Sequence, residues 1–165
     1  MENLPAHFRL LKINHGAVRR LFKELNYYEK EERELRSKVD KLKNENRNEC
    51  EIIRSEEILQ ETVRVLPHIS NSLQKSLQKL CEIIYEHFLN ILEIKDNKIE
   101  ICKACSENEL KEILMTQYDD FCKEIEDINQ ILEKIFIHIK DASLPVCPSV
   151  VKSNLVLPKE ECVDI

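Results

Sequence analysis

The chain has 165 residues, of which 34% are charged and 5% aromatic, with a single glycine and no tryptophan. The lone glycine argues against a P-loop, a dinucleotide-binding fingerprint or a nucleophile elbow, because each requires two or more glycines. Strand-rich folds also use glycine in their turns, so the composition predicts an all-α protein. The net charge is −6. The acidic excess falls in the last third, and no strong basic stripe predicts a nucleic-acid partner.

Hydropathy and cysteine usage predict a soluble, cytoplasmic protein. The first residues carry charge throughout and contain no apolar run of signal-peptide length. No stretch approaches the roughly 18–20 apolar residues that a membrane span needs, so no membrane partner is expected. Seven cysteines, an odd number without a disulfide-framework rhythm, fit a reducing compartment.

The first predicted helix covers about residues 7–46. Its apolar residues alternate between spacings of three and four, an average of 3.5 that keeps one seam facing a partner helix. The seam contains Val18, Leu21, Leu25, Tyr28, Leu35, Val39 and Leu42. Such a helix would be about 60 Å long, so we expect a rod. An asparagine-rich stretch, residues 43–51, then predicts a turn.

The second predicted helix covers about residues 52–95. Its seam residues recur every seven positions, at Ile52, Leu59, Leu66, Leu73 and Leu80. Pro67 interrupts the hydrogen-bond pattern but not the apolar phase, so the sequence predicts one helix with a kink there.

The third predicted helix covers about residues 107–140 and starts at a capping box, Ser106 to Glu109. Before it, Asp96-Asn97 predicts a turn. Residues 98–105 alternate like a strand, but a single short strand would have no partner, so we interpret them as a connector or a helical turn. Residues 141–165 contain three prolines and no periodicity, which predicts a flexible tail.

Together these elements predict an elongated antiparallel three-helix bundle with coiled-coil-like seams over residues 1–140. His87 falls on a seam position of the second helix, where a core histidine is expected rather than a ligand. Tyr27, Ile58 and Val65 lie off the seams. They contribute to a strip that binds a partner, touch the third helix, or are isolated exposed apolar residues.

Catalytic or metal chemistry is not expected, and neither is a cofactor. Cys102 and Cys105 form a C-x-x-C pair, a spacing compatible with zinc or redox chemistry. The other cysteines do not supply a second pair, and the βαβ context of thioredoxin-like proteins is missing. Asp119, Asp120 and Asp127 have no nucleophilic or basic companion, so the sequence does not predict an enzyme.

Two blocks of sequence resemble the tubulin-specific chaperone A family, the tubulin-folding cofactor A family. Residues 12–31 read KINHGAVRRLFKELNYYEKE and residues 57–67 read EILQETVRVLP. The order of the blocks, their spacing and the proline inside the second helix agree with the family pattern. Residues 98–165 depart from it, since members usually stop soon after a short third helix.

The resemblance implies a cytosolic, cytoskeleton-associated cochaperone that needs neither nucleotide nor metal. Such proteins bind quasi-native β-tubulin released by the cytosolic chaperonin and pass it, with other members of the pathway, to αβ-heterodimer assembly. Arg19, Arg20 and Lys23 lie off the seam, so they are the first candidates for contacting acidic tubulin. The remaining candidates are Glu24, Tyr27, Glu31, Glu57, Ile58, Glu61 and Val65. Ion pairing within the bundle is the competing role for the charged ones.

The heptads alone support a second interpretation, a coiled-coil scaffold or self-associating structural protein. Seams that are satisfied within one chain predict a monomer that binds tubulin, which we favour. Pairing of residues 107–140 between chains predicts a dimer or larger assembly that has no need of tubulin.

Overall fold

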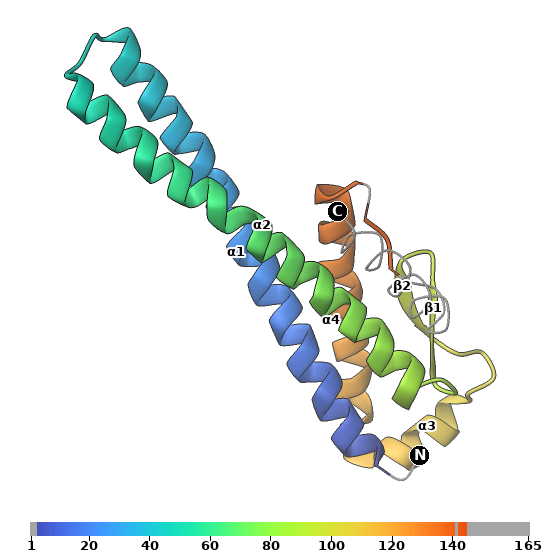
Figure 1. Ribbon diagram of the computed structural model, residues 1–165. Coiled ribbons are helices and arrows are strands. Elements are labelled where there is room, and N and C mark those ends of the chain that lie inside the picture. The colour runs from blue at the N-terminus through green and yellow to red at the C-terminus, as the bar shows by residue number, and fades with distance from the viewer. Residues whose placement is uncertain (1–2, 141, 145–165) are drawn as a thin grey trace, which may run out of the picture. The chain divides into compact units, whose positions relative to one another are not determined.

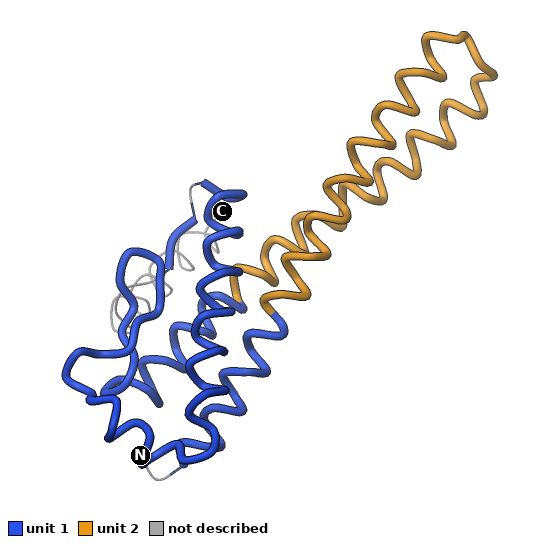
Figure 2. Tube along the Cα trace, turned by 180° about the vertical axis from the view of Figure 1, so that it is seen from behind, with its two compact units in different colours: residues 1–17, 76–165 blue, residues 18–75 orange. Residues whose placement is uncertain are grey.

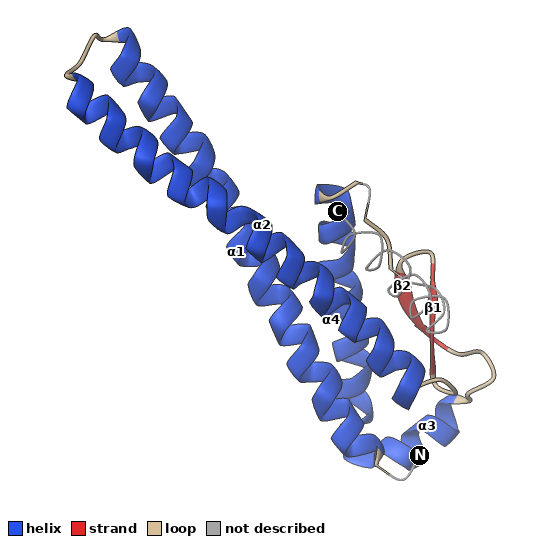
Figure 3. Ribbon diagram, in the orientation of Figure 1, coloured by secondary structure: helices blue, strands red, loops and turns tan. Residues whose placement is uncertain are grey.

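A computed structural model describes residues 3–140 and 142–144 of the chain. The described part is mostly helical, with one small sheet, as Figure 3 shows. Its elements in chain order are α1 (Leu4–Asn44), α2 (Glu49–His87), β1 (Leu92–Lys95), β2 (Lys98–Ile101), α3 (Glu107–Leu114) and α4 (Tyr118–His138) (Figure 1). The prediction of a predominantly helical protein is confirmed. Its finer form, an antiparallel three-helix bundle, stays a prediction.

The chain divides into two compact units (Figure 2). Unit 1 comprises residues 1–17 and 76–165, and unit 2 comprises residues 18–75. The helices α1 and α2 each contribute residues to both units.

Unit 2 is a helical hairpin whose turn is encoded by asparagine. Asn46 has φ 52°, a left-handed conformation that asparagine adopts more readily than most residues. The backbone N–H of Asn46 then reaches the carbonyl of Lys43, and that of Arg47 reaches the carbonyl of Leu42. These two bonds form a Schellman motif that ends α1. The Asn48 side chain accepts from the Cys50 N–H at 3.0 Å and starts α2, which confirms the predicted turn.

The core of unit 2 follows the predicted seams. The buried apolar side chains of this unit are those of Val18, Leu21, Phe22, Leu25, Val39, Leu59, Ile69 and Leu73. Other seam residues, including Tyr28, Leu35 and Leu66, are only half-buried. The helix α2 runs through Pro67. The kink expected there stays a prediction.

The predicted end of the second helix, near residue 95, is wrong. The helix α2 ends at His87, and residues 92–101 form an antiparallel hairpin in which Leu92 pairs with Ile101 and Ile94 with Ile99. The apolar residues at 92, 94 and 99 are buried and the charged ones between them exposed, so a period of two prevails over the helical one. Asp96 and Asn97, with φ 53° and 62°, make the turn that connects the two strands, so the turn predicted at these two residues is confirmed.

The side chain of Asn129, in α4, occupies the outer edge of this hairpin. Its amide nitrogen donates to the Ile99 carbonyl and its oxygen accepts from the Ile99 N–H, both at 2.8 Å. An edge strand presents unpaired backbone groups, and here one side chain satisfies a complete pair. The interpretation of residues 98–105 as a connector or helical turn is therefore wrong for 98–101, because β1 supplies the missing partner.

The single helix predicted over residues 107–140 is also wrong, because the segment breaks after Leu114. The Ser106 hydroxyl accepts from the Glu109 N–H at 3.1 Å, so α3 starts at the predicted cap. Met115 then has φ 53° and ψ −116°, which an α-helix does not accommodate. A short 3-10 turn at Met115–Gln117 precedes α4, whose seam from Phe121 to Ile135 is buried as expected.

Unit 1 contains an aromatic cluster with buried polar contacts beside it. The Phe121 ring lies 5.3 Å from that of Phe8 and 5.9 Å from that of Phe88. His15 is 4% exposed, and its Nδ1 lies 2.6 Å from Oε2 of Glu124. These contacts hold α4 against the first turns of α1. The tail predicted at 141–165 falls almost wholly outside the described residues.

Candidate protein-binding surface on unit 2

All ten candidate residues lie in unit 2, which the structure describes completely. Six of them belong to α1 and four to α2. Hydrophobic burial fixes how each helix is rotated, because its seam must face the other helix. The remaining faces of the hairpin are therefore determined by position relative to the seam.

The outer face of α1 carries a basic stripe with one aromatic residue. Arg19, Arg20 and Lys23 are exposed, and the Tyr27 side chain is 61% exposed. Their positions turn them away from Val18 and its seam neighbours, at 100° per residue. We call these four residues the basic face.

Most of the charge on the basic face is free of internal partners. Arg20 lies 3.9 Å from Glu24, an exposed i,i+4 pair of the kind that contributes little to stability. Arg19 and Lys23 take part in none of the ion pairs found within the described residues. Tyr27 contacts the edge of the Tyr28 ring, with centroids 5.1 Å apart. The structure thus gives most of this face no role in holding the hairpin together.

Glu31 differs from the other candidates because it ties the two helices together. Its Oε2 accepts a hydrogen bond from the Thr62 hydroxyl at 3.1 Å, and Thr62 is 6% exposed. A buried hydroxyl needs such a partner, since leaving it unpaired costs about 1–3 kcal/mol. Glu31 therefore has a structural task in the hairpin.

The candidates on α2 form an apolar pair and an acidic pair. Leu59 is buried, so residues 58 and 60 lie on opposite flanks of it. Ile58 and Val65 are seven residues apart and share one flank, where they are 41% and 36% exposed. We call this the apolar flank. Glu57 and Glu61 are exposed and line a groove between α1 and α2.

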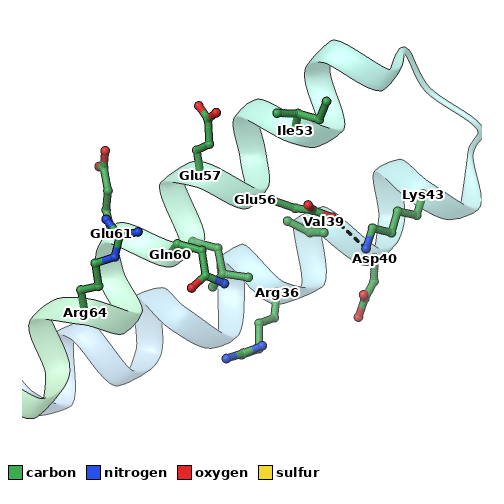
Figure 4. A pocket seen from close by; sticks show the side chains of 11 residues that line it. Arg36, Val39, Asp40, Lys43, Ile53, Glu56, Glu57, Gln60, Glu61 and Arg64 are labelled. Carbon is green, nitrogen blue, oxygen red and sulfur yellow. Dashed lines mark ion pairs between the residues drawn. The ribbon is translucent and has the colours of Figure 1, made fainter.

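This groove has a volume of about 660 Å³ and lies between α1 and α2 (Figure 4). We call it the hairpin groove. Val39 and Leu59, 5% and 6% exposed, are its buried apolar lining. The other lining residues are Arg36, Asp40, Lys43, Ile53, Glu56, Glu57, Gln60, Glu61 and Arg64.

Sequence reasoning missed most of the groove. It singled out Glu57 and Glu61, but not Ile53 or Arg64 on the same helix. A usable signal was present, because positions 53, 57, 60 and 64 follow the three-four spacing of a single helical stripe. The residues of α1 could not be assigned to that stripe without the register of the hairpin.

Two ion pairs use part of the charge around the groove. Nζ of Lys43 lies 2.8 Å from Oε1 of Glu56, a contact that Figure 4 marks with a dashed line. The hydrogen bond and charge of Glu56 raise the pKa of Lys43. Arg36 pairs with Glu32 on its own helix at 2.9 Å. Glu57, Glu61 and Arg64 take part in no ion pair found among the described residues.

The C-x-x-C pair lies outside this surface, between β2 and α3. Cys102 and Cys105 are free thiols, joined across a turn by the Cys105 N–H and the Cys102 carbonyl at 3.0 Å. Burial, and then the charges of Glu93 and Glu109 respectively, raise the pKa of both thiols. A raised pKa lowers the thiolate fraction that metal binding and redox exchange use. Within residues 3–140 and 142–144, no group of three or more His, Cys, Asp and Glu side chains is arranged to hold a metal ion.

His87, expected on a core seam, stacks on another histidine. Its ring centroid lies 3.9 Å from that of His7, with 19° between the planes. Burial, followed by the charge of His87, lowers the pKa of His7. This contact lies in unit 1, whereas the candidate residues belong to unit 2.

Comparison with known proteins identifies the family. A family model described as tubulin binding cofactor A matches residues 6–106. The chain belongs to this family. The match includes the whole of unit 2, with all ten candidates and the hairpin groove, and stops before α3. The family resemblance inferred from residues 12–31 and 57–67 is therefore confirmed.

Individual relatives agree with this assignment to the cofactor A family. Tubulin-specific chaperone A of Mus musculus is 37% identical over 76 residues, which are 46% of this chain and 70% of the mouse protein. The Homo sapiens protein of that name is 34% identical over 76 residues, which are 46% of this chain and 70% of the human protein. The Gallus gallus protein is 33% identical over 106 residues, 64% of this chain and 88% of the chicken protein. No solved structure gives a significant match.

No helix in the described ranges combines the length and apolar character required to span a membrane.

Proposed function

We propose that this chain is a tubulin-folding cochaperone. In this proposal it binds and stabilises quasi-native β-tubulin after release from the cytosolic chaperonin and supplies it for αβ-heterodimer assembly. The observation that carries the proposal is the match of residues 6–106 to the tubulin binding cofactor A family. The relatives that this chain matches over most of their length are named tubulin-specific chaperone A, and their names support the proposal.

The surface of unit 2 suits the capture of a partly folded client. Such a client exposes apolar surface and unpaired strand edges, which aggregate unless they are covered. The apolar flank offers Ile58 and Val65 to that surface, and the basic face offers Arg19, Arg20 and Lys23 to acidic segments. Opposite charges across an interface speed the encounter and fix its orientation more than they add affinity.

The proposed mechanism is stoichiometric binding, not turnover. Apart from Glu31, the candidate residues are surface groups on a helical hairpin, and they need neither nucleotide nor metal to bind. We place the protein in the cytoplasm, as a monomer that acts with other members of the tubulin-folding pathway. The antiparallel three-helix arrangement of the chain and the bend at Pro67 belong to the same proposal.

Charge reversal on the basic face tests the proposed contact. Arg19→Glu with Arg20→Glu changes two exposed side chains. The free energy of unfolding, measured by thermal melting, should stay within about 0.5 kcal/mol of wild type. Affinity for β-tubulin should fall, mainly through slower association, and should depend less on salt. The matched control is Lys123→Glu with Lys134→Glu on α4, two exposed cations outside unit 2. If the basic-face variant binds as the control does, the basic face is not a contact.

The scaffold interpretation differs in a measurable way. It predicts that purified protein runs as a dimer or larger assembly in multi-angle light scattering. The cochaperone proposal predicts a monomer that shifts to the mass of a complex when β-tubulin is added.

A further inference from the structure

The hairpin groove of unit 2 carries charge that the hairpin itself does not use. Its lining includes four carboxylates, those of Asp40, Glu56, Glu57 and Glu61, against three cations. Lys43 is paired with Glu56, and Arg36 with Glu32, which belongs to the same helix as Arg36. Because these two cations are already engaged, the charge that remains around the groove is predominantly negative.

The unpaired carboxylates lie together on one side of the groove. Glu57 and Glu61 are one helical turn apart on α2, so they are neighbours on its surface. Both are exposed, and neither joins an ion pair found in the described part of the chain. Arg64, the cation next along this side, also stays outside those pairs. The structure of the hairpin gives no internal reason for this arrangement.

Apolar surface lies beside these carboxylates. Val39 and Leu59 are the buried apolar lining of the groove, and Ile53 at one end is 49% exposed. Ile53 and Arg64 are eleven residues apart, so the side of the groove formed by α2 is about 16 Å long. This length equals about three turns of a helix, and an apolar lining beside charged residues is how grooves bind amphipathic helices.

We propose that the hairpin groove is the docking site for a basic amphipathic helix of the tubulin client. The occupant places an apolar side chain against Val39 and Leu59 and presents Lys or Arg to Glu57 and Glu61. Charge complementarity selects this occupant, because a carboxylate left over after internal pairing is best satisfied by a guanidinium or ammonium group. The inference rests on the proposed function and adds the chemistry of the segment that is bound.

The groove and the basic face would then contact regions of opposite sign on the client. The basic face lies on the outer side of α1, whereas Glu57 and Glu61 lie on α2. A client with an acidic region and a basic helix can satisfy both in one orientation only. Such a pattern fixes register and suppresses wrong partners, since like charges brought together cost several kcal/mol.

Charge reversal at the groove, in the full chain, tests the inference. Glu57→Lys with Glu61→Lys is compared with Glu126→Lys with Glu133→Lys on α4, two exposed glutamates outside the groove. Both double variants change the net charge equally, so long-range steering is matched. Equilibrium titration of labelled tubulin should show binding weakened about tenfold or more by the groove variant and by less than about twofold by the control.

Three further measurements separate docking from folding and from self-association. Circular dichroism melts show whether the groove variant is folded. If that variant is unfolded, Glu57→Gln with Glu61→Gln is tested in its place. Ile53→Ser should weaken binding about threefold or more, whereas Ile137→Ser at an exposed site on α4 should not. Light scattering of the free proteins shows whether the groove variants change mass. A change in mass without a change in tubulin affinity would assign the groove to a second copy of the chain and overturn the inference.

The outcomes distinguish this inference from the proposed function. If the wild-type protein binds no tubulin, the proposed function falls and the groove assignment falls with it. If the wild type binds and the groove variant binds equally well, only the groove assignment is wrong. Selective loss in the groove variants, with the α4 controls unaffected, supports both.

Discussion

Replacing Leu73 by alanine tests whether the seam between the helices holds unit 2 together. The Leu73 side chain is 1% exposed, at a position that the heptad pattern assigns to the core. Removing a fully buried leucine side chain costs its transfer free energy plus a cavity term, together about 3 kcal/mol. For a chain of this length, that loss corresponds to a decrease in Tm of about 6–12 °C.

The matched substitution is Ile58→Ala on the apolar flank. Ile58 is 41% exposed, so the same truncation creates little cavity and should cost less than about 1 kcal/mol. Urea unfolding followed by circular dichroism measures both free energies of unfolding. Tubulin titration is done at a temperature where both variants are folded. Ile58→Ala, although the more stable variant, should bind tubulin more weakly than Leu73→Ala. If the free energy of unfolding of Leu73→Ala lies within about 1 kcal/mol of the wild-type value, the seam assignment is wrong.

Three further predictions concern unit 1 and the thiols. Asn129→Ala leaves the buried N–H and carbonyl of Ile99 unpaired, so it should cost about 2 kcal/mol and speed hydrogen exchange at the Ile99 amide; unchanged exchange would contradict this role. Because the pKa of His7 is lowered in the folded state, the unfolded chain takes up a proton first, and the free energy of unfolding should fall as pH decreases through about 6.5. His7→Phe should flatten that dependence in urea titrations, and an equally steep profile would refute it. Burial raises the pKa of Cys81 to about 12, so iodoacetamide should modify the exposed Cys50 and spare Cys81 in the folded protein.

The fold of unit 2 was predictable from sequence because its information is local. Seam residues such as Leu25 and Leu59 recur at helical spacing, and hydrophobic burial converts that spacing into a packed interface. The turn was visible as a run of asparagines, since Asn46 adopts the left-handed conformation that ends α1. Neither inference required a contact between distant segments.

The β-hairpin was not predicted, because its stability depends on a distant helix. A two-stranded sheet is marginal by itself, and this one is completed by Asn129, thirty residues after the strand it holds. Only its turn was predicted, because Asp96 and Asn97 both tolerate positive φ. The break at Met115 had no signal either, because methionine favours helix and yet has φ 53° here.

The candidate surface was predicted in part. The basic face could be identified because Arg19, Arg20 and Lys23 lie off the seam inside a family block. The hairpin groove could not, because Arg36 and Lys43 become neighbours of Glu57 only through the register of α1 against α2. For the same reason sequence alone gave Glu31 no structural role, whereas the Thr62 hydroxyl provides one.

Capture of tubulin by the purified full-length protein tests the central claim most directly, with α- and β-tubulin probed separately. The intact chain is required, because a protein ending near Lys95 would lack α4 and expose Phe8 and Phe88. The cochaperone proposal predicts retention of β-tubulin in preference to α-tubulin, near one molecule per chain. Retention of neither subunit, by a protein that circular dichroism shows to be helical and folded, would contradict the proposal and leave the scaffold interpretation.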